Sequence, residues 1–178
     1  MTPMLKDFNL LVSTSRRNER NACSETWYLL REVGDPHAKT DVTGIMGLVT
    51  AKTKLDPKSV MPLLRKLLIE RPWEFRYVLK LVPIQMIVQS ALDIFTEKAK
   101  LFNEEIPEDE SFRVTVEKRR SNLKTEDIIE AIAPHIKRKV NLSNPDKIAL
   151  VEVIGEITGL SLITADEILS VEREKRNL

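Results

Sequence analysis

Few residues of this chain are of the types that perform covalent or metal chemistry, and their spacing is not that of a catalytic set. Cys23 is the single cysteine and falls on the apolar side of a predicted helix, which favours a packed thiol over a reactive one. His37 and His135 are far apart and lack the carboxylate spacing of a metal site. These residues predict no metal and no cofactor.

The glycines and the acidic run predict no ligand loop either. The five glycines form neither a dinucleotide fingerprint nor a P-loop, and Gly44 to Gly47 is typical of a hairpin turn. The run Glu104 to Glu110 lacks the alternating ligands and the glycine of a calcium loop, so a solvated linker is the better interpretation. We predict that the chain is not an enzyme. The alternative is a catalyst that uses Cys23 or an unassigned pair of carboxylates.

The remaining candidates for chemistry are cations, which gather in clusters. Two basic triplets, Lys118–Arg120 and Lys137–Lys139, flank a predicted helix, and Arg16, Arg17 and Arg20 stand where another helix is predicted to begin. One triplet by itself is most simply a solvated surface. Several cations on one concave side would instead neutralise phosphates and bind a polyanion with a steep dependence on salt. The pairing of the triplets favours a nucleic-acid partner.

Composition describes an ordinary globular protein with an uneven charge. The 178 residues are 42% apolar and 31% charged, with a net charge of +1. Residues 1–83 hold 14 cations and 9 anions, and residues 84–178 hold 14 cations and 18 anions. We find neither a membrane-spanning apolar run nor a signal sequence, and the lone cysteine fits a reducing compartment. We therefore expect a cytoplasmic protein without a membrane partner.

These side chains must be positioned by secondary structure, and residues 1–83 predict the order β, α, β, β, α, β. The predicted elements are a strand at Phe8–Ser13, a helix at Arg16–Val33, a hairpin of Asp41–Ile45 and Gly47–Lys52, a helix from Asp56-Pro57 to Glu70, and a strand at Phe75–Val82. This is the split βαβ or ferredoxin-like order. We predict a first domain over residues 1–83, with Pro83 at the boundary.

Residues 84–178 predict a second domain with the order α, β, α, β, β, α. Its expected elements are a helix at Ile84–Phe102, a strand at Phe112–Glu117, a helix from Thr125 that Pro134 kinks or ends early, strands at Lys147–Ile154 and Leu160–Ile163, and a last helix from the capping box at Thr164 to about Lys175. The fold class is therefore α+β.

Three runs in this second half resemble the THUMP domain, an RNA-binding module of tRNA-modifying enzymes that usually follows a ferredoxin-like domain. They are F-R-V-T-V-E-K-R from Phe112, E-D-I-I-E-A-I-A-P-H-I from Glu126, and V-N-L-S-N-P-D-K-I-A-L-V-E-V-I-G from Val140. The resemblance covers residues 5 to 163, and the chain ends one predicted helix later. The chain thus resembles stand-alone THUMP proteins, such as the adaptor of the tRNA N4-acetylcytidine acetyltransferase, rather than THUMP enzymes with a catalytic domain.

The resemblance implies binding of the tRNA acceptor stem and its 3′ end. The matching positions are Arg113, Lys118, Arg119, Arg120, Lys137, Arg138, Lys139, Asn144, Pro145 and Asp146. We expect the cations to contact phosphates, together with Lys147, Arg16, Arg17 and Arg20, whereas Asn144 and Asp146 could instead shape a turn.

The expected function is that of a non-catalytic adaptor that presents tRNA to a separate enzyme, which the resemblance indicates is a tRNA cytidine N4-acetyltransferase. Two alternatives remain open: an RNA-binding subunit of a different tRNA-modifying enzyme, for thiolation or methylation, and a protein-interaction scaffold. The oligomeric state and the role of the final helix, residues 164–176, are not predicted.

Overall fold

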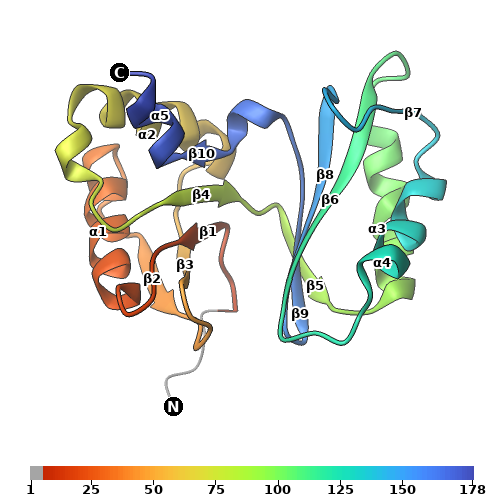
Figure 1. Ribbon diagram of the computed structural model, residues 1–178, viewed down its shortest axis with the longest axis horizontal. Helices are drawn as coiled ribbons and strands as arrows, with labels where there is room; N and C mark the ends of the chain where they lie inside the picture. The colour runs from red at the N-terminus through yellow and green to blue at the C-terminus, as the bar shows by residue number, and fades with distance from the viewer. Residues whose placement is uncertain (1–5) are drawn as a thin grey trace. The chain divides into compact units, whose positions relative to one another are not determined.

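The computed structural model describes residues 6–178, which form two compact units (Figure 1). The first unit combines the residues up to Ile84 with Asp166–Leu178, and the second unit comprises Gln85–Ala165. The chain therefore leaves the first unit, builds the whole of the second, and returns to the first. The predicted mixture of α and β structure is confirmed.

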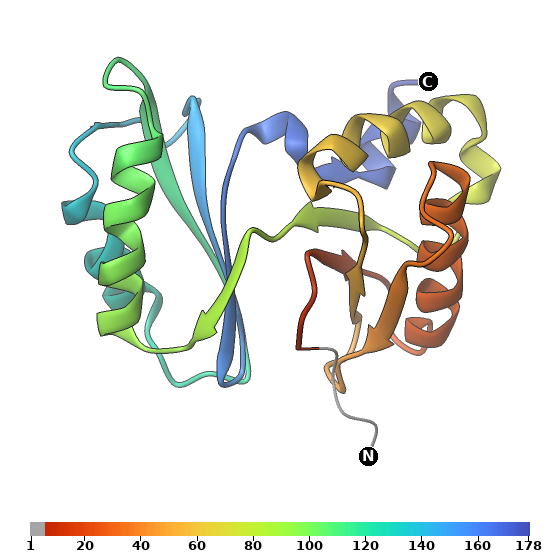
Figure 2. The ribbon, with the colours of Figure 1, turned by 180° about the vertical axis from the view of Figure 1, so that it is seen from behind.

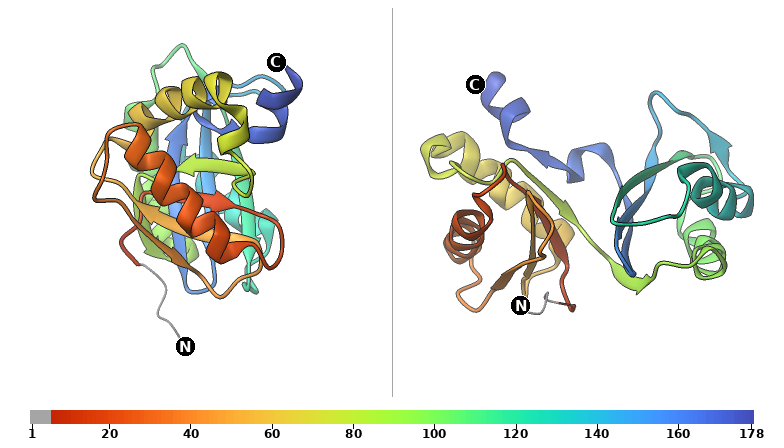
Figure 3. Two further views of the ribbon diagram at one scale, coloured as in Figure 1. Left: turned by 90° about the vertical axis from the view of Figure 1, so that its left-hand side faces the viewer. Right: turned by 60° about the horizontal axis from the view of Figure 1, so that its bottom comes forward.

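The first unit follows the predicted β, α, β, β, α, β order. Its elements are β1 (Leu10–Ser13), α1 (Glu19–Glu32), β2 (Lys39–Val42), β3 (Leu48–Lys52), α2 (Pro57–Glu70), the 3-10 turn Pro72–Glu74 and β4 (Lys80–Pro83). The antiparallel sheet has the strand order β10-β4-β1-β3-β2, where β10 is Leu169–Ser170. Helices α1 and α2 lie on one face of this sheet (Figure 3).

Side-chain hydrogen bonds to the backbone determine where α2 and β4 begin. Asp56 caps α2 as predicted, because its carboxylate accepts a hydrogen bond from the Ser59 N–H at 3.2 Å. Strand β4 is shorter than predicted. The N–H groups of Arg76, Tyr77 and Val78 donate to the Glu25 carboxylate of α1, so they are not available to a neighbouring strand.

The C-terminal segment corrects the prediction that residues 84–178 form one domain. Leu169 of β10 pairs with Leu81 of β4, and Leu169 and Val171 are buried in the core of the first unit. The last helix, α5, covers only Val171–Arg176, and the residues of the expected capping box form the 3-10 turn Ala165–Glu167 instead of opening an α-helix. Pairing of β10 with β4 and burial of Leu169 and Val171 in the core outweigh the local helix signal.

The second unit is a mixed sheet covered on one face by two helices (Figures 1 and 2). Its elements are β5 (Met86–Gln89), α3 (Leu92–Glu105), β6 (Ser111–Arg119), α4 (Thr125–Ile132), the 3-10 turn Ala133–His135, β7 (Lys139–Val140), β8 (Lys147–Ile154) and β9 (Ile157–Ile163). The strand order is β5-β9-β8-β6-β7, with β6 parallel to both β8 and β7. The core under the helices includes Phe95, Phe102, Phe112 and Ile128.

Two predictions in this unit have clear outcomes. The helix predicted from Ile84 begins only at Leu92, because Met86–Gln89 form β5 and pair with β9. Met86 and Val88 fit the period of a strand as well as that of a helix, and the pairing partner decides between them. The predicted early end at Pro134 is confirmed, since α4 stops at Ile132 and continues as a 3-10 turn.

Candidate nucleic-acid interface

The two basic triplets of the second unit lie at opposite ends of one strand. Strand β6 has nine residues, and the first triplet stands at and just beyond its end. Lys139, the last residue of the second triplet, is paired with Ser111 at the beginning of the same strand. At about 3.3 Å per residue, the two triplets are roughly 25 Å apart. Both triplets thus belong to the same strand and helix unit, but they stand at its two ends.

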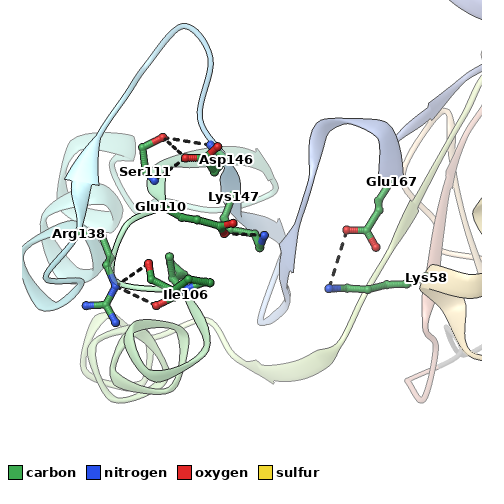
Figure 4. A network of polar contacts seen from close by, with 9 residues as sticks. Lys58, Ile106, Glu110, Ser111, Arg138, Asp146, Lys147 and Glu167 are labelled. Carbon is green, nitrogen blue, oxygen red and sulfur yellow. Dashed lines mark hydrogen bonds and ion pairs between the residues drawn. The ribbon is translucent and has the colours of Figure 1, made fainter.

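Cations at the beginning of β6 are largely engaged in holding the fold together (Figure 4). The guanidinium of Arg138 donates to the Ile106 and Asn103 carbonyls, each at 2.9 Å, and so closes the C-terminal end of α3. Lys147 forms an ion pair with Glu110 at 2.7 Å. Lys137 and Lys139 remain exposed, although the Lys137 ammonium also donates to the Pro134 carbonyl. The beginning of β6 therefore has fewer cations available to a polyanion than the sequence indicates, because Arg138 and Lys147 already have partners.

The turn before β8 is built by carboxylate and amide side chains. Asp146 accepts hydrogen bonds from the Ser111 N–H at 2.8 Å and from the Ser111 hydroxyl at 3.0 Å, and these bonds lower the pKa of the Asp146 carboxyl (Figure 4). The Asn141 side-chain oxygen accepts from the Asn144 N–H, and Arg113 donates to the Leu142 carbonyl. The turn-shaping interpretation of Asp146 is confirmed, while the Asn144 side chain is exposed.

The three cations at the end of β6 have different surroundings. Lys118 lies on the helix-covered face, in register with the core residue Val153, and its ammonium donates to the Leu123 carbonyl at 2.8 Å. Arg119 is on the opposite face and forms an ion pair at 2.7 Å with Glu152, which is 1% exposed. Arg120 is exposed and has a φ of 53°. Of the three, the side chains of Lys118 and Arg120 are exposed, whereas that of Arg119 is half-buried.

A pocket of about 570 Å³ opens beside Arg120. Its lining comes from the end of β5, the start of α3, the loop after β6 and the β8–β9 turn: Gln89, Ser90, Ala91, Arg120, Ser121, Asn122, Leu123, Gly155 and Glu156. Helix α4 begins immediately after this loop, and neither α3 nor α4 has a side-chain cap. The N-terminal end of a helix favours an anion, although Asp93, Glu126 and Asp127 in the first turns offset part of that potential.

The arginines of the first unit border a second pocket, of about 350 Å³. Arg17 and Arg20 line it together with Glu19 and the β2–β3 turn residues Gly44, Ile45 and Met46, and with Val42. Arg16, Arg17 and Arg20 are all exposed. The Glu19 carboxylate accepts a weak hydrogen bond from the Gly47 N–H at 3.4 Å, which links the start of α1 to the turn. This cluster belongs to a different unit from the triplets.

A comparison with protein families matches the THUMP domain over residues 88–163. This chain contains a THUMP domain. The match begins in β5 and ends at the last residue of β9, so it coincides with the second unit. The predicted resemblance to a THUMP domain is confirmed at this level.

Solved structures share the fold at low sequence identity. PH1313 from Pyrococcus horikoshii Ot3 has a TM-score of 0.60 and 17% identity, covering 89% of this chain and 55% of that one. TrmN from Thermus thermophilus has a TM-score of 0.57 and 16% identity, covering 86% and 44%. A 4-thiouridine synthetase in complex with RNA and bound ATP has a TM-score of 0.54 and 13% identity, covering 92% and 42%. This chain thus spans about half, or less, of their lengths. No curated protein sequence matches it.

Several residues that line the pocket beside Arg120 were not among the predicted site residues. Ser121 and Asn122 follow the first triplet directly, and their place in a short strand-to-helix loop was a usable signal. Gln89 and Ser90 could not be found in this way, because the sequence favours a helix where β5 forms. Ser90 is held by the Thr158 hydroxyl at 2.7 Å and by the Glu156 carbonyl at 2.9 Å.

Cys23, the single cysteine of the chain, is half-buried on α1. Burial raises the pKa of the Cys23 thiol, so the packed role predicted for it is favoured over that of a nucleophile. Within residues 6–178, no group of three or more His, Cys, Asp or Glu side chains is arranged to hold a metal ion. No helix of that same range is long and apolar enough to cross a membrane.

Proposed function

We propose that this chain binds tRNA at the acceptor stem and 3′ end and presents it to a separate modifying enzyme. The observation that carries the proposal is the THUMP match over residues 88–163, which is nearly the whole of the second unit. The likeness to a 4-thiouridine synthetase that binds RNA supports it, because that likeness extends over 92% of this chain and so includes both units. In this proposal the first unit is a ferredoxin-like domain, in keeping with its β4-β1-β3-β2 strand order.

The RNA site that we propose is the pocket beside Arg120. Its volume of about 570 Å³ is in the range of small-molecule sites, so one unpaired nucleotide could enter it. Arg120 and Lys118 would contact phosphate oxygens, while Ser121, Asn122 and Ser90 offer hydroxyl and amide groups to a ribose or a base edge. Single-stranded RNA suits such a site because its bases are not held in a duplex.

The other predicted contact residues divide by exposure. Lys137, Lys139 and Asn144 are exposed and are proposed to make weaker contacts at the far end of β6. Arg113, Arg119, Arg138 and Lys147 already bind partners within the domain, so we assign them to positioning the strands and loops. Substituting these four would change RNA binding mainly through the fold.

The adaptor role and the identity of the partner enzyme extend the proposal further. The resemblance of the sequence to the adaptor of the tRNA N4-acetylcytidine acetyltransferase supports a tRNA cytidine N4-acetyltransferase as the partner. A second candidate is the RNA-binding subunit of a thiolation or methylation enzyme, which the likeness to the 4-thiouridine synthetase favours. Incubating pure protein with tRNA and acyl, methyl or sulfur donors, followed by nucleoside mass spectrometry, tests the role. A modified nucleoside formed by this chain alone would exclude a non-catalytic adaptor.

Binding of whole tRNA and of an acceptor minihelix, measured by fluorescence anisotropy at several salt concentrations, tests the RNA site. Arg120→Ala should weaken both complexes by about tenfold and lower the salt slope by about one, as expected for one lost phosphate contact. Lys100→Ala is the matched control, since Lys100 is an exposed cation on α3 outside the pocket. Equal affinity of all three proteins would place the RNA elsewhere.

A further inference from the structure

One edge of strand β6 is open along most of its length. Strand β8 pairs with β6 from Phe112 to Arg119, whereas β7 lies beside the other edge at Ser111 and Phe112. Within residues 6–178, no strand continues along that edge beyond Phe112. The strands at the other sheet edges, β2, β5 and β10, have only two to four residues, and short edge strands limit pairing with another chain. We call the segment Arg113–Arg119 the free edge of β6.

Every second residue of β6 directs its backbone groups to the free edge. Successive residues of a strand point their N–H and C=O groups to alternate sides of the chain. The Phe112 carbonyl accepts a hydrogen bond from the Asn141 N–H at 2.9 Å, on the side of β7. Val114, Val116 and Lys118 therefore present their N–H and C=O groups away from β8. A row of this kind is a template for a further strand.

The side chains along the free edge are apolar on the helix-covered face of the sheet. Val114 and Val116 pack against the core cluster but are only half-buried, whereas Ala149 and Val151, their partners in register on β8, are fully buried. The free edge contains neither proline nor glycine, the residues that usually interrupt strand pairing. A strand added here with apolar side chains on the same face completes the burial of both valines.

Glu117 gives the opposite face of the free edge a negative charge without a partner. Its side chain is exposed, and within residues 6–178 it forms no hydrogen bond or ion pair. Its partner in register on β8 is Glu152, which forms an ion pair with Arg119 at 2.7 Å. Opposite charges directly across a strand pair are favourable. A cation that approaches from the free edge therefore has Glu117 as its counterion.

A second copy of this chain does not complement the free edge. Antiparallel pairing of β6 with itself centred on Val116 places Arg113 against Arg119, and pairing centred on Glu117 places that carboxylate against its own copy. Like charges directly opposite each other destabilise a strand pair. Registers centred nearer the start of β6 bring the second copy against β7, which already occupies the edge there. The charge pattern therefore favours a segment of a different protein.

We propose that the free edge of β6 receives an extended segment of a partner protein as an additional antiparallel strand. The segment carries apolar side chains beside Val114 and Val116 and a lysine or arginine opposite Glu117. Backbone hydrogen bonds supply the affinity, and the side chains supply the specificity. The inference rests on the proposed function, in which the partner is a separate modifying enzyme.

Defined peptides test the free edge by fluorescence anisotropy on the whole protein. The probe is a labelled, acetylated peptide of alternating threonine and valine with one central lysine in place of a threonine, and we expect saturable binding. A matched peptide with glutamate in place of the lysine should bind about fivefold more weakly. N-methylation of the valines removes the backbone donors that face β6 and should weaken binding by about tenfold or more.

Charge reversal at Glu117 provides the matching change on the protein. Glu117→Lys should reverse the preference, so that the glutamate peptide binds about fivefold more tightly than the lysine peptide. The thermal midpoint should not change, because the Glu117 side chain is exposed. Glu97→Lys, at an exposed glutamate on α3, is the control and should keep the preference of the wild type.

The contrary results separate this inference from RNA binding. Absence of binding by the lysine peptide, or a preference that Glu117→Lys does not change, would overturn the inference. A dimer of the wild type that Val116→Pro dissociates in sedimentation experiments would make a second copy the occupant and would overturn it as well. Binding of tRNA is measured on the same proteins, and Glu117→Lys should bind tRNA at least as tightly as the wild type does. Failure of the wild type to bind tRNA would refute the proposed function whatever the peptides do.

Discussion

The contrast between Arg119 and Arg120 shows how adjacent residues of one type acquire different roles. A strand directs successive side chains to opposite faces, and β6 ends between these two residues. Arg119 consequently reaches Glu152 on the neighbouring strand, whereas Arg120 leaves the sheet and lines the pocket. Substituting both together would therefore mix a loss of stability with a loss of RNA contact.

Arg119→Ala should destabilise the protein without removing a direct RNA contact. It leaves the Glu152 carboxylate, 1% exposed, without its 2.7 Å ion pair, and breaking such a pair costs about 3 kcal/mol. Urea denaturation measures this loss. Lys118→Ala is the neighbouring control and should cost less than about 1 kcal/mol, because the Lys118 side chain is exposed. An unchanged unfolding midpoint for Arg119→Ala would show that Glu152 does not depend on this partner.

At the scale of elements, the C-terminal segment completes the first unit. Strand β10 extends the sheet beyond β4, and α5 is attached to α2 through the ion pair of Arg65 with Glu174 at 3.0 Å. The Arg65 guanidinium also donates to the Ile168 carbonyl, and Lys58 lies 4.0 Å from Glu167 (Figure 4). The segment therefore covers a sheet edge that would otherwise be exposed to other strands.

Leu169→Ala should destabilise the first unit by about 3 kcal/mol, the usual loss for a fully buried leucine. Hydrogen exchange followed by mass spectrometry would then show faster exchange in β4 and α2, with the THUMP domain unchanged. Ile168→Ala at the preceding, half-buried position is the matched control and should have a smaller effect. Equal exchange in the two variants would mean that β10 contributes little to the first unit.

At the scale of the whole molecule, the two units have separate cores and opposite net charge. The cluster under α3 and α4 is made of residues from the second unit alone, and the cluster under α1 and α2 includes residues from both ends of the chain. The chain crosses between the units twice, once after Ile84 and once after Ala165. The second unit therefore resembles a domain inserted into the first.

A fragment of residues 85–165 should fold by itself, because the hydrophobic cluster beneath α3 and α4 contains no residue from outside that range. We expect cooperative unfolding by circular dichroism. We also expect weaker tRNA binding than for the whole chain at equal salt, because the fragment is net acidic. Full affinity of the fragment would show that the first unit does not contribute to RNA binding.

The sequence predicts most local elements and the family of the second unit. Asp56-Pro57 marks the start of α2, Pro134 marks the end of α4, and the runs at Phe112, Glu126 and Val140 indicate the THUMP domain. These signals are local, since caps, proline and hydrophobic periodicity act within a few residues. The prediction fails where pairing with a strand distant in sequence determines the secondary structure, as at Met86–Gln89 and at Leu169–Ser170.

The sequence by itself therefore determines which residues are cationic, where helices begin and end, and which family the region from β5 to β9 matches. Only the tertiary structure decides which cations remain available. Lys118–Arg120 and Lys137–Lys139 have the same appearance in sequence, but the pairing of β6 with β7 and β8 places them at opposite ends of a strand and binds Arg119 to Glu152. The physical reason is that hydrogen-bonded register and side-chain alternation are set by strands distant in sequence.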